Sequence, residues 1–256
     1  RATALELLQN YGGAPATEAL LAGLKDQSPL VRSQAVGGMD RLPPEARGEV
    51  LGPLVMDSMA SVRISAARLL AGSPNLPADV AAGLASAVEE YVALQLSTGD
   101  QPEAHLNLAL LYGAEGNVDK AEAAYRMAIT RDKQFIPARV NLANLLNSQG
   151  RNEEAEHLLL EAISLAPREG ELQYSMGLLL AEQSRLDEAT TYMGEAARLM
   201  PTRGRVFYNY GLLLQHLERR AEAEIALLKA SELSPSDGSI LQALIILYSQ
   251  EERWEE

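Results

Sequence analysis

Three histidines, His105, His157 and His216, are the side chains best suited to bind a metal or move a proton in this chain, which has no cysteine. Zinc sites need three or four ligands, and ligands on one helix are usually three or four residues apart. No two of these histidines have that spacing, and no H-x-x-x-H motif occurs. We therefore predict structural or surface roles for all three and no metal site.

No other residue pattern predicts catalysis. The pairs Gly12-Gly13 and Gly37-Gly38 lack the Gly-Lys-Ser/Thr that completes a phosphate-binding loop, so we interpret them as turns or close helix contacts. No nucleophile and base can be paired by spacing. A chain without cysteine also has no place for thiol catalysis, an iron–sulfur cluster or covalently attached haem. The prediction is a non-enzymatic chain with no cofactor of its own.

Composition indicates helices packed on helices. Of the 256 residues, 47% are apolar but only 5% are aromatic, and Ala and Leu supply most of the apolar share. The net charge of −13 argues against nucleic acid or an anionic membrane as a partner, and it weakly favours basic partners. No apolar run reaches the roughly 18 residues of a membrane span.

A period of 34 residues begins at Pro102 and restarts at Ile136, Gly170, Gly204 and Gly238. Small residues recur at positions 8, 20 and 27 of the four full repeats, where two antiparallel helices would cross closely, whereas the truncated fifth has Ile245 at position 8. Large residues at positions 7, 11 and 24 would fill the space between helix pairs. Proline at position 32 ends the second helix of three repeats, because it cannot continue the hydrogen-bond ladder. Over residues 102–256 this pattern resembles the tetratricopeptide repeat, with four full copies and a truncated fifth.

The N-terminal part has a different period. Segment 26–35 matches segment 57–66 at a shift of 31 residues, and the same shift places Arg1 in register with Arg32 and Arg63. We expect the aspartates that open the two segments, Asp26 and Asp57, to pair with Arg32 and Arg63 along a ladder between repeats. We also expect Arg1 to belong to a repeat whose first half precedes it, so that the chain is a piece of a longer protein. The acidic turn followed by Val-Arg resembles HEAT-like repeats of the phycobilisome-lyase type.

Between the two arrays lies a segment that we interpret as an adaptor. Pro77 is placed to start a helix, and Ala87 and Tyr91 fall where a preceding tetratricopeptide unit would have its small and large residues. The predicted fold is all-α, a right-handed α-α superhelix or solenoid. Its predicted parts are HEAT-like repeats over 1–74, an adaptor helix and short linker over 75–101, and tetratricopeptide repeats over 102–256.

The first helices of the tetratricopeptide repeats carry the candidate binding residues. The resemblance implies that positions 2, 5, 6, 9, 12 and 13 of each repeat line a concave groove. Asparagine there can pair with both halves of a peptide group, and tyrosine adds apolar area with one hydroxyl. The line of asparagines resembles the ladder in the superhelix of O-linked N-acetylglucosamine transferase. The predicted groove residues are Asn107, Leu110, Asn141, Asn144, Tyr174, Leu178, Arg205, Tyr208, Asn209 and Leu212.

The groove lacks the carboxylate clamp of chaperone-binding tetratricopeptide proteins. That clamp needs lysine at position 5 of one repeat and basic residues at positions 2 and 6 two repeats later. Arg205 stands alone at position 2. We therefore predict no capture of C-terminal Glu-Glu-Val-Asp peptides.

Two functions remain open. The first is a non-catalytic scaffold that binds an extended segment of a partner protein or peptide in the groove. The second is an accessory region of a redox protein, because the order of repeats and stretches such as RATALELL and LPPEAR resemble the C-terminal half of bacterial multihaem c-type cytochrome-like proteins. That resemblance implies haem motifs upstream and a periplasmic location, and without it we expect a cytoplasmic one. A third alternative is self-association through an uncapped C-terminal end, where we expect Leu244, Leu247 and Tyr248 to be exposed.

Overall fold

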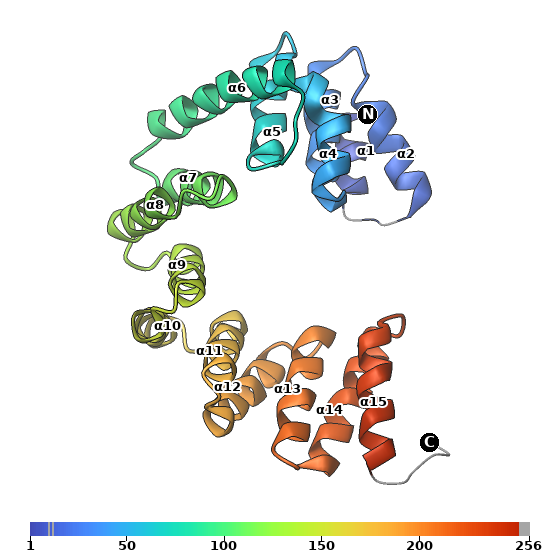
Figure 1. Cartoon of the computed structure of the whole chain (residues 1–256), viewed down its shortest axis with the longest axis vertical. Helices are drawn as coiled ribbons and strands as arrows, with labels where there is room; N and C mark the ends of the chain where they lie inside the picture. The colour runs from blue at the N-terminus through green and yellow to red at the C-terminus, as the bar shows by residue number, and fades with distance from the viewer. Residues whose placement is uncertain (10, 12, 251–256) are drawn as a thin grey trace. The chain divides into compact units, whose positions relative to one another are not determined.

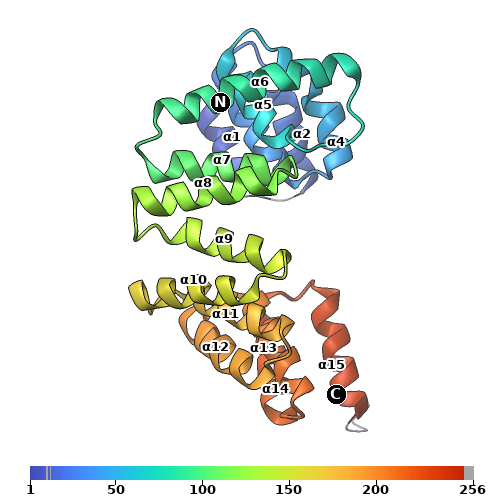
Figure 2. The ribbon, with the colours of Figure 1, turned by 60° about the vertical axis from the view of Figure 1, so that its left-hand side comes forward.

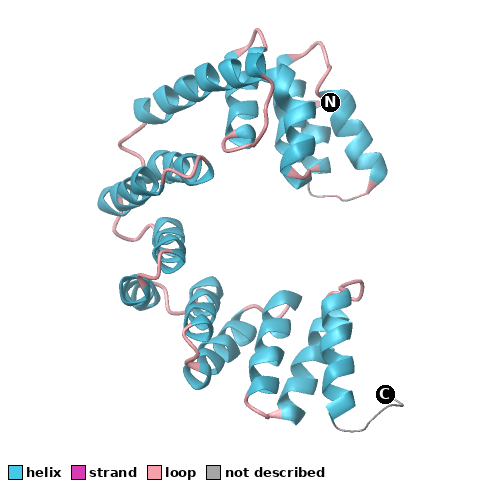
Figure 3. Cartoon of the chain, viewed as in Figure 1, coloured by secondary structure: helices cyan, strands magenta, loops and turns pink. Residues whose placement is uncertain are grey.

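The computed structural model of the chain describes residues 1–9, 11 and 13–250. Every regular element in these residues is a helix, with no strand among them, which confirms the all-α prediction (Figure 3). The chain forms two compact units, Arg1–Asp132 and Lys133–Glu256. The predicted part boundaries near residues 74 and 101 stay predictions. The expected second helix of the fifth repeat, with Trp254, lies outside the described residues.

The first unit holds the N-terminal repeats, the adaptor and the first 34-residue repeat (Figure 1). In the described part of either unit, no helix is long and apolar enough to cross a membrane. The elements of the first unit are α1 (Ala2–Leu8), α2 (Ala14–Gly23), α3 (Pro29–Gly37), the 3-10 turn η1 (Gly38–Arg41), α4 (Pro44–Leu51), the 3-10 turn η2 (Gly52–Met56), α5 (Ala60–Leu70), α6 (Ala78–Ser97), α7 (Pro102–Ala114) and α8 (Val118–Arg131).

The second unit holds the later 34-residue repeats, whose helices pack pairwise in chain order. In Figures 1 and 2, α13, α14 and α15 lie side by side, in agreement with the contacts between α13 and α14 and between α14 and α15. Its helices are α9 (Ile136–Ser148), α10 (Asn152–Leu165), α11 (Gly170–Glu182), α12 (Leu186–Leu199), α13 (Gly204–His216), α14 (Arg220–Leu233) and α15 (Gly238–Gln250).

The predicted 34-residue register is confirmed, because α7, α9, α11, α13 and α15 begin at the five predicted repeat starts. The small residues at positions 20 and 27 are fully buried in all four complete repeats. A Cβ added to Gly211, at position 8, would come within 2.7 Å of the Leu227 side chain and 3.4 Å of the Ala223 carbonyl oxygen. Glycine at that position therefore sets the close approach of α13 to α14.

The second helices of three repeats begin with the same ion pair. An arginine at position 16 donates from both Nε and a terminal nitrogen to a glutamate three residues later, at 2.7 or 2.8 Å. An acidic residue in the first turn of a helix also complements the helix dipole. These pairs are Arg151–Glu154, Arg185–Glu188 and Arg219–Glu222.

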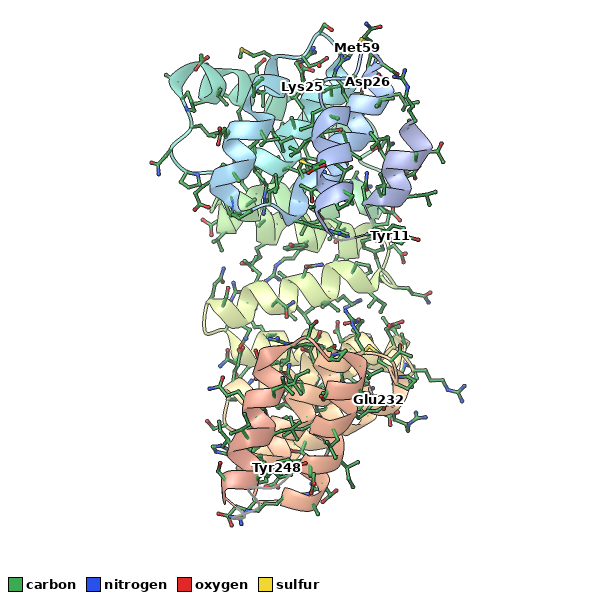
Figure 4. The ribbon with its side chains drawn as sticks, turned by 90° about the vertical axis from the view of Figure 1, so that its right-hand side faces the viewer. Tyr11, Lys25, Asp26, Met59, Glu232 and Tyr248 are labelled. Carbon is green, nitrogen blue, oxygen red and sulfur yellow. The ribbon has the colours of Figure 1, made fainter. Side chains whose placement is uncertain are left out.

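The predicted ladder between N-terminal repeats is present in the first unit. Each arginine reaches an acidic residue 25 to 27 positions further along the chain, in the following repeat or adaptor. Figure 4 shows Asp26 and Met59, from the turns before α3 and α5, at the same edge of this unit. The sequence did not indicate the acidic partner of the last rung, which comes from the adaptor α6. The three rungs are Arg1–Asp26, Arg32–Asp57 and Arg63–Glu90.

The adaptor is a 20-residue helix, α6, that Pro77 precedes as predicted. Ala87 is fully buried and Tyr91 is 4% exposed, so the two predicted packing residues do face the interior of the unit. The helix contacts both α5 and α7. It thus joins the two kinds of repeat within the first unit.

The prediction of which residues of the last helix, α15, are exposed was wrong. Leu244 and Leu247 are buried against α14, and the Tyr248 hydroxyl donates to Glu224 at 3.1 Å. The prediction chose the wrong side of α15, because the side that carries these residues packs on the preceding repeat. The exposed apolar residues of α15 are Leu241, Ile245 and Ile246.

Candidate partner-binding site

One side of α13 carries most of the predicted groove residues of the second unit. Tyr208 and Asn209 follow Arg205 by three and four residues, Leu212 follows them by four and three, and His216 follows Leu212 by four, so all five share one side of the helix. None of them is buried, and Leu212 is 37% exposed. The remaining sides of α13 carry its buried residues, which include those that pack on α14. This row is therefore open to a ligand.

A hydrogen bond joins this row to the preceding first helix, α11. The Asn209 side-chain nitrogen donates to the Tyr174 hydroxyl oxygen at 2.7 Å, across a separation of 35 residues. Leu178 lies one helical turn beyond Tyr174, on the same side of α11, and is half-buried. This hydrogen bond bridges two first helices, and we call the exposed and half-buried residues around it the α11–α13 face: Tyr174, Leu178, Arg205, Tyr208, Asn209 and Leu212.

The cation on this face is positioned by an aromatic ring. The Arg205 guanidinium lies over the Tyr208 ring, 5.6 Å from its centroid. Such an arrangement attracts a cation to the ring and leaves the guanidinium N–H groups along its edge for a ligand. Sequence reasoning named both residues but not their contact.

A polar hollow of about 580 Å³ lies at the other end of α13. Leu212, Gln215, His216, Glu218 and Arg220 line it, from the end of α13 and the start of α14. Glu218 has a positive φ of 58°, which turns the chain there between the two helices. The hollow extends the α11–α13 face, and its last two residues escaped prediction because neither lies on a first helix: Glu218 is in the turn and Arg220 begins α14.

The predicted groove residues on α9 are less tightly placed. The Asn141 side chain donates to the carbonyl of Pro137 at 2.8 Å, one turn back on its own helix, and Asn144 is exposed. A residue that sequence reasoning did not select, Asn147, instead donates to Glu182 and links α9 to α11. Its position in the repeat, one of those expected to line the groove, was the available signal.

The remaining two predicted groove residues belong to the first unit. The Asn107 side-chain nitrogen donates to the Gln95 side-chain oxygen at 3.1 Å, which ties α7 to α6. Leu110 is 48% exposed. The amide of Asn107, like those of Asn141 and Asn209, thus uses one donor inside the chain. A side-chain amide has a second N–H and an oxygen that can still bind a ligand.

The three histidines lie in different repeats and have different surroundings. His105 pairs with the carbonyl of Gly99 at 2.8 Å, His157 is 74% exposed at its side chain, and His216 lines the polar hollow. Among the described residues no three metal-ligating side chains gather.

A second hollow, on another side of the second unit, is apolar and has a volume of about 680 Å³. It forms in the fourth repeat, where the residue at position 4 is aromatic instead of polar. In three repeats a polar side chain at this position pairs with the carbonyl six residues earlier, whereas Phe207 occupies it in the fourth and has no donor. Phe207 instead lines the hollow with Pro201, Tyr210, Ile225 and Leu228. The three polar contacts are His105 to Gly99 at 2.8 Å, Arg139 to Lys133 at 2.7 Å and Gln173 to Pro167 at 3.2 Å.

Paired helices in a fixed register, with an open row along the first helix of each pair, define a helical-repeat protein. Residues 114–179 and 204–237 each match a family model described as tetratricopeptide repeat. The chain thus contains tetratricopeptide repeats, and proteins built from them are protein-interaction scaffolds.

Solved structures support the same fold. MamA from Desulfovibrio magneticus RS-1 is 17% identical, with a TM-score of 0.54 over 59% of this chain and 86% of its own. PilF of Pseudomonas aeruginosa is 19% identical, with a TM-score of 0.56 over 82% of this chain and 86% of its own. No curated protein sequence matches. At these identities the likeness extends to the fold alone.

Proposed function

We propose that the chain is a non-catalytic scaffold that binds an extended segment of a partner protein in the groove formed by the first helices of its tetratricopeptide repeats. The observation that carries the proposal is the Asn209–Tyr174 hydrogen bond, because it joins two first helices into one open surface. That surface offers exposed apolar area at Leu212, a cation at Arg205, and the second N–H and the oxygen of the Asn209 amide.

The proposal is tested by selecting ligands without assuming their sequence. The full chain is immobilised and used to select from phage-displayed random dodecapeptides, and the selected peptides are then measured by fluorescence anisotropy. Replacing Tyr208 and Asn209 together by alanine is expected to weaken binding about tenfold or more, since central aromatic and polar contacts dominate such interfaces. Circular dichroism checks that the helical content is unchanged.

The control is Ile225→Ala, which removes a 70%-exposed side chain from the apolar hollow rather than from the α11–α13 face. This variant is expected to bind like the wild type. The reverse result, with binding lost on Ile225→Ala and kept in the double variant, would place the partner at the apolar hollow and contradict the proposal. If the variant with both Asn141→Ala and Asn209→Ala bound the selected peptides with unchanged affinity, the asparagine ladder would no longer be part of the proposal.

The alternative, an accessory region of a periplasmic multihaem cytochrome c-type protein, rests on sequence resemblance alone, as does the likeness of the N-terminal repeats to HEAT-like repeats. In that reading haem would be attached to a longer parent protein and this chain would position it or its partner. Sequencing the parent reading frame and staining its natural product for covalent haem tests this. A reading frame without any C-x-x-C-H motif would eliminate it.

A further inference from the structure

We propose that the α11–α13 face selects a partner segment that carries a carboxylate side chain, with Arg205 as the residue that binds it. The inference rests on the proposed function, because it names the chemistry of the segment that the same face would hold. It runs against the net charge of −13, which by itself favours basic partners.

Arg205 differs from most arginines of the second unit in having no acidic partner among the described residues. Each of those other arginines is paired with a glutamate of the second unit, so its charge is already balanced within the chain. They are Arg139, Arg151, Arg185, Arg198, Arg203 and Arg219. Arg205 is also exposed, and its guanidinium has the planar pair of donors that fits a carboxylate.

The acidic residues close to this face do not compete for Arg205. Glu171, at the start of α11, pairs with Arg203, and Glu182, at its end, accepts from Asn147. On α13 itself the open row contains no acidic residue. The face therefore presents one unpaired positive charge beside neutral polar and apolar groups.

The ring of Tyr208 holds this charge in place. With the guanidinium 5.6 Å from the ring centroid, the side chain has fewer orientations to lose when a ligand binds. Leu178 and Leu212, on the two helices of the face, provide apolar contact for the residues beside the ligand carboxylate. The polar hollow at the other end is less selective, because Glu218 lies in it together with Arg220 and His216.

The test uses the phage-selected peptides, because selection from a random library does not fix the charge of the peptides in advance. Peptides selected by the wild-type chain are expected to be enriched in Asp or Glu over the unselected library. Replacing that acidic residue by Asn or Gln, in peptides with blocked ends, is expected to weaken binding to the wild type about tenfold. Arg205→Gln is expected to bind the acidic and the amide peptide equally, and Arg205→Lys to retain part of the difference.

Arg168→Gln is the matched control, because Arg168 is also exposed and has no acidic partner in the described part of the chain, but lies in the turn before α11. It is expected to keep the full preference for the acidic peptide. Selected peptides without acidic enrichment, or a preference that survives in Arg205→Gln, would overturn the inference while leaving the proposed function intact. Selection of no peptide at all would overturn the proposed function, and the inference with it.

Discussion

The middle rung of the N-terminal ladder should be the most sensitive point of the first unit. Arg32 donates from Nε and Nη2 to the two carboxylate oxygens of Asp57, at 2.7 and 2.9 Å. Its Nη1 also donates to the backbone carbonyls of Asp26 and Gln27, at 2.7 and 3.1 Å. Both partners are largely shielded, with side chains only 14% and 9% exposed. Arg32→Gln would therefore leave a shielded carboxylate and two carbonyls without their donor.

The expected cost follows from that shielding. A hydrogen bond to a charged group contributes about 1.5–3 kcal/mol, and an unpaired buried charge costs about 3–5 kcal/mol. The Met59 N–H still donates to Asp57 at 2.9 Å, which offsets part of the loss. We expect Arg32→Gln to lower the free energy of unfolding by about 2–4 kcal/mol.

The assay is urea unfolding of the full chain, followed by helical circular dichroism. The control is Arg1→Gln, which breaks the first rung: its ion pair with Asp26 has the same 2.7 Å distance, but the Arg1 side chain is 75% exposed. An exposed pair contributes at most about 1 kcal/mol. Equal losses of unfolding free energy in the two variants would refute the reasoning, because burial would then not determine how much an ion pair of the ladder contributes.

Two further predictions concern the first unit. A Cβ at Gly72 would overlap the carbonyl of Ala114, whereas at Gly116, which has the same φ of +73°, it would meet no atom of the described residues within 4 Å. Gly116→Ala should therefore lower the free energy of unfolding by about 1–2 kcal/mol, the strain of a left-handed backbone. Gly72→Ala should lower it clearly more, and urea unfolding measures both. The second prediction concerns acid: the hydrogen bond from Arg32 lowers the pKa of Asp57 below its ordinary 3.8, so its contribution to stability is present above that value and is lost as the pH falls through the lowered pKa. Unfolding free energies measured from neutral pH into acid should therefore fall more for the wild type than for Arg32→Gln, and parallel curves would contradict the linkage.

The repeat register could be predicted from the sequence because the same packing requirement recurs every 34 residues. A small residue at position 8 or 20 has one physical reason, the close crossing of two helices, and that reason holds in all four full repeats. The N-terminal ladder was predictable in the same way, since Arg32 and Arg63 and their acidic turns repeat together. Its last rung was not, because Glu90 lies in a helix outside that period.

For the binding face, the sequence predicted which residues share one side of a helix, but not how two helices are arranged next to each other. Periodicity along one helix places Arg205, Tyr208 and Asn209 on one side, yet the bond from Asn209 to Tyr174 depends on how two helices 35 residues apart are set against each other. The partnering of charges is equally non-local. Only the structure shows that Arg203 is paired while Arg205, two residues later, has no acidic partner in the described part of the chain.

Position 4 shows what a strong period can conceal. The variation there, from His105 through Arg139 and Gln173 to Phe207, was visible in the sequence but had no meaning until the structure showed the carbonyl that the first three reach. A polar side chain at this position closes the junction between repeats by pairing with that carbonyl. Phenylalanine cannot donate, so in the fourth repeat the junction is apolar and opens into the hollow of about 680 Å³. Positions that break a repeat therefore distinguish one repeat surface from another, and they are read correctly only with the backbone groups that they face.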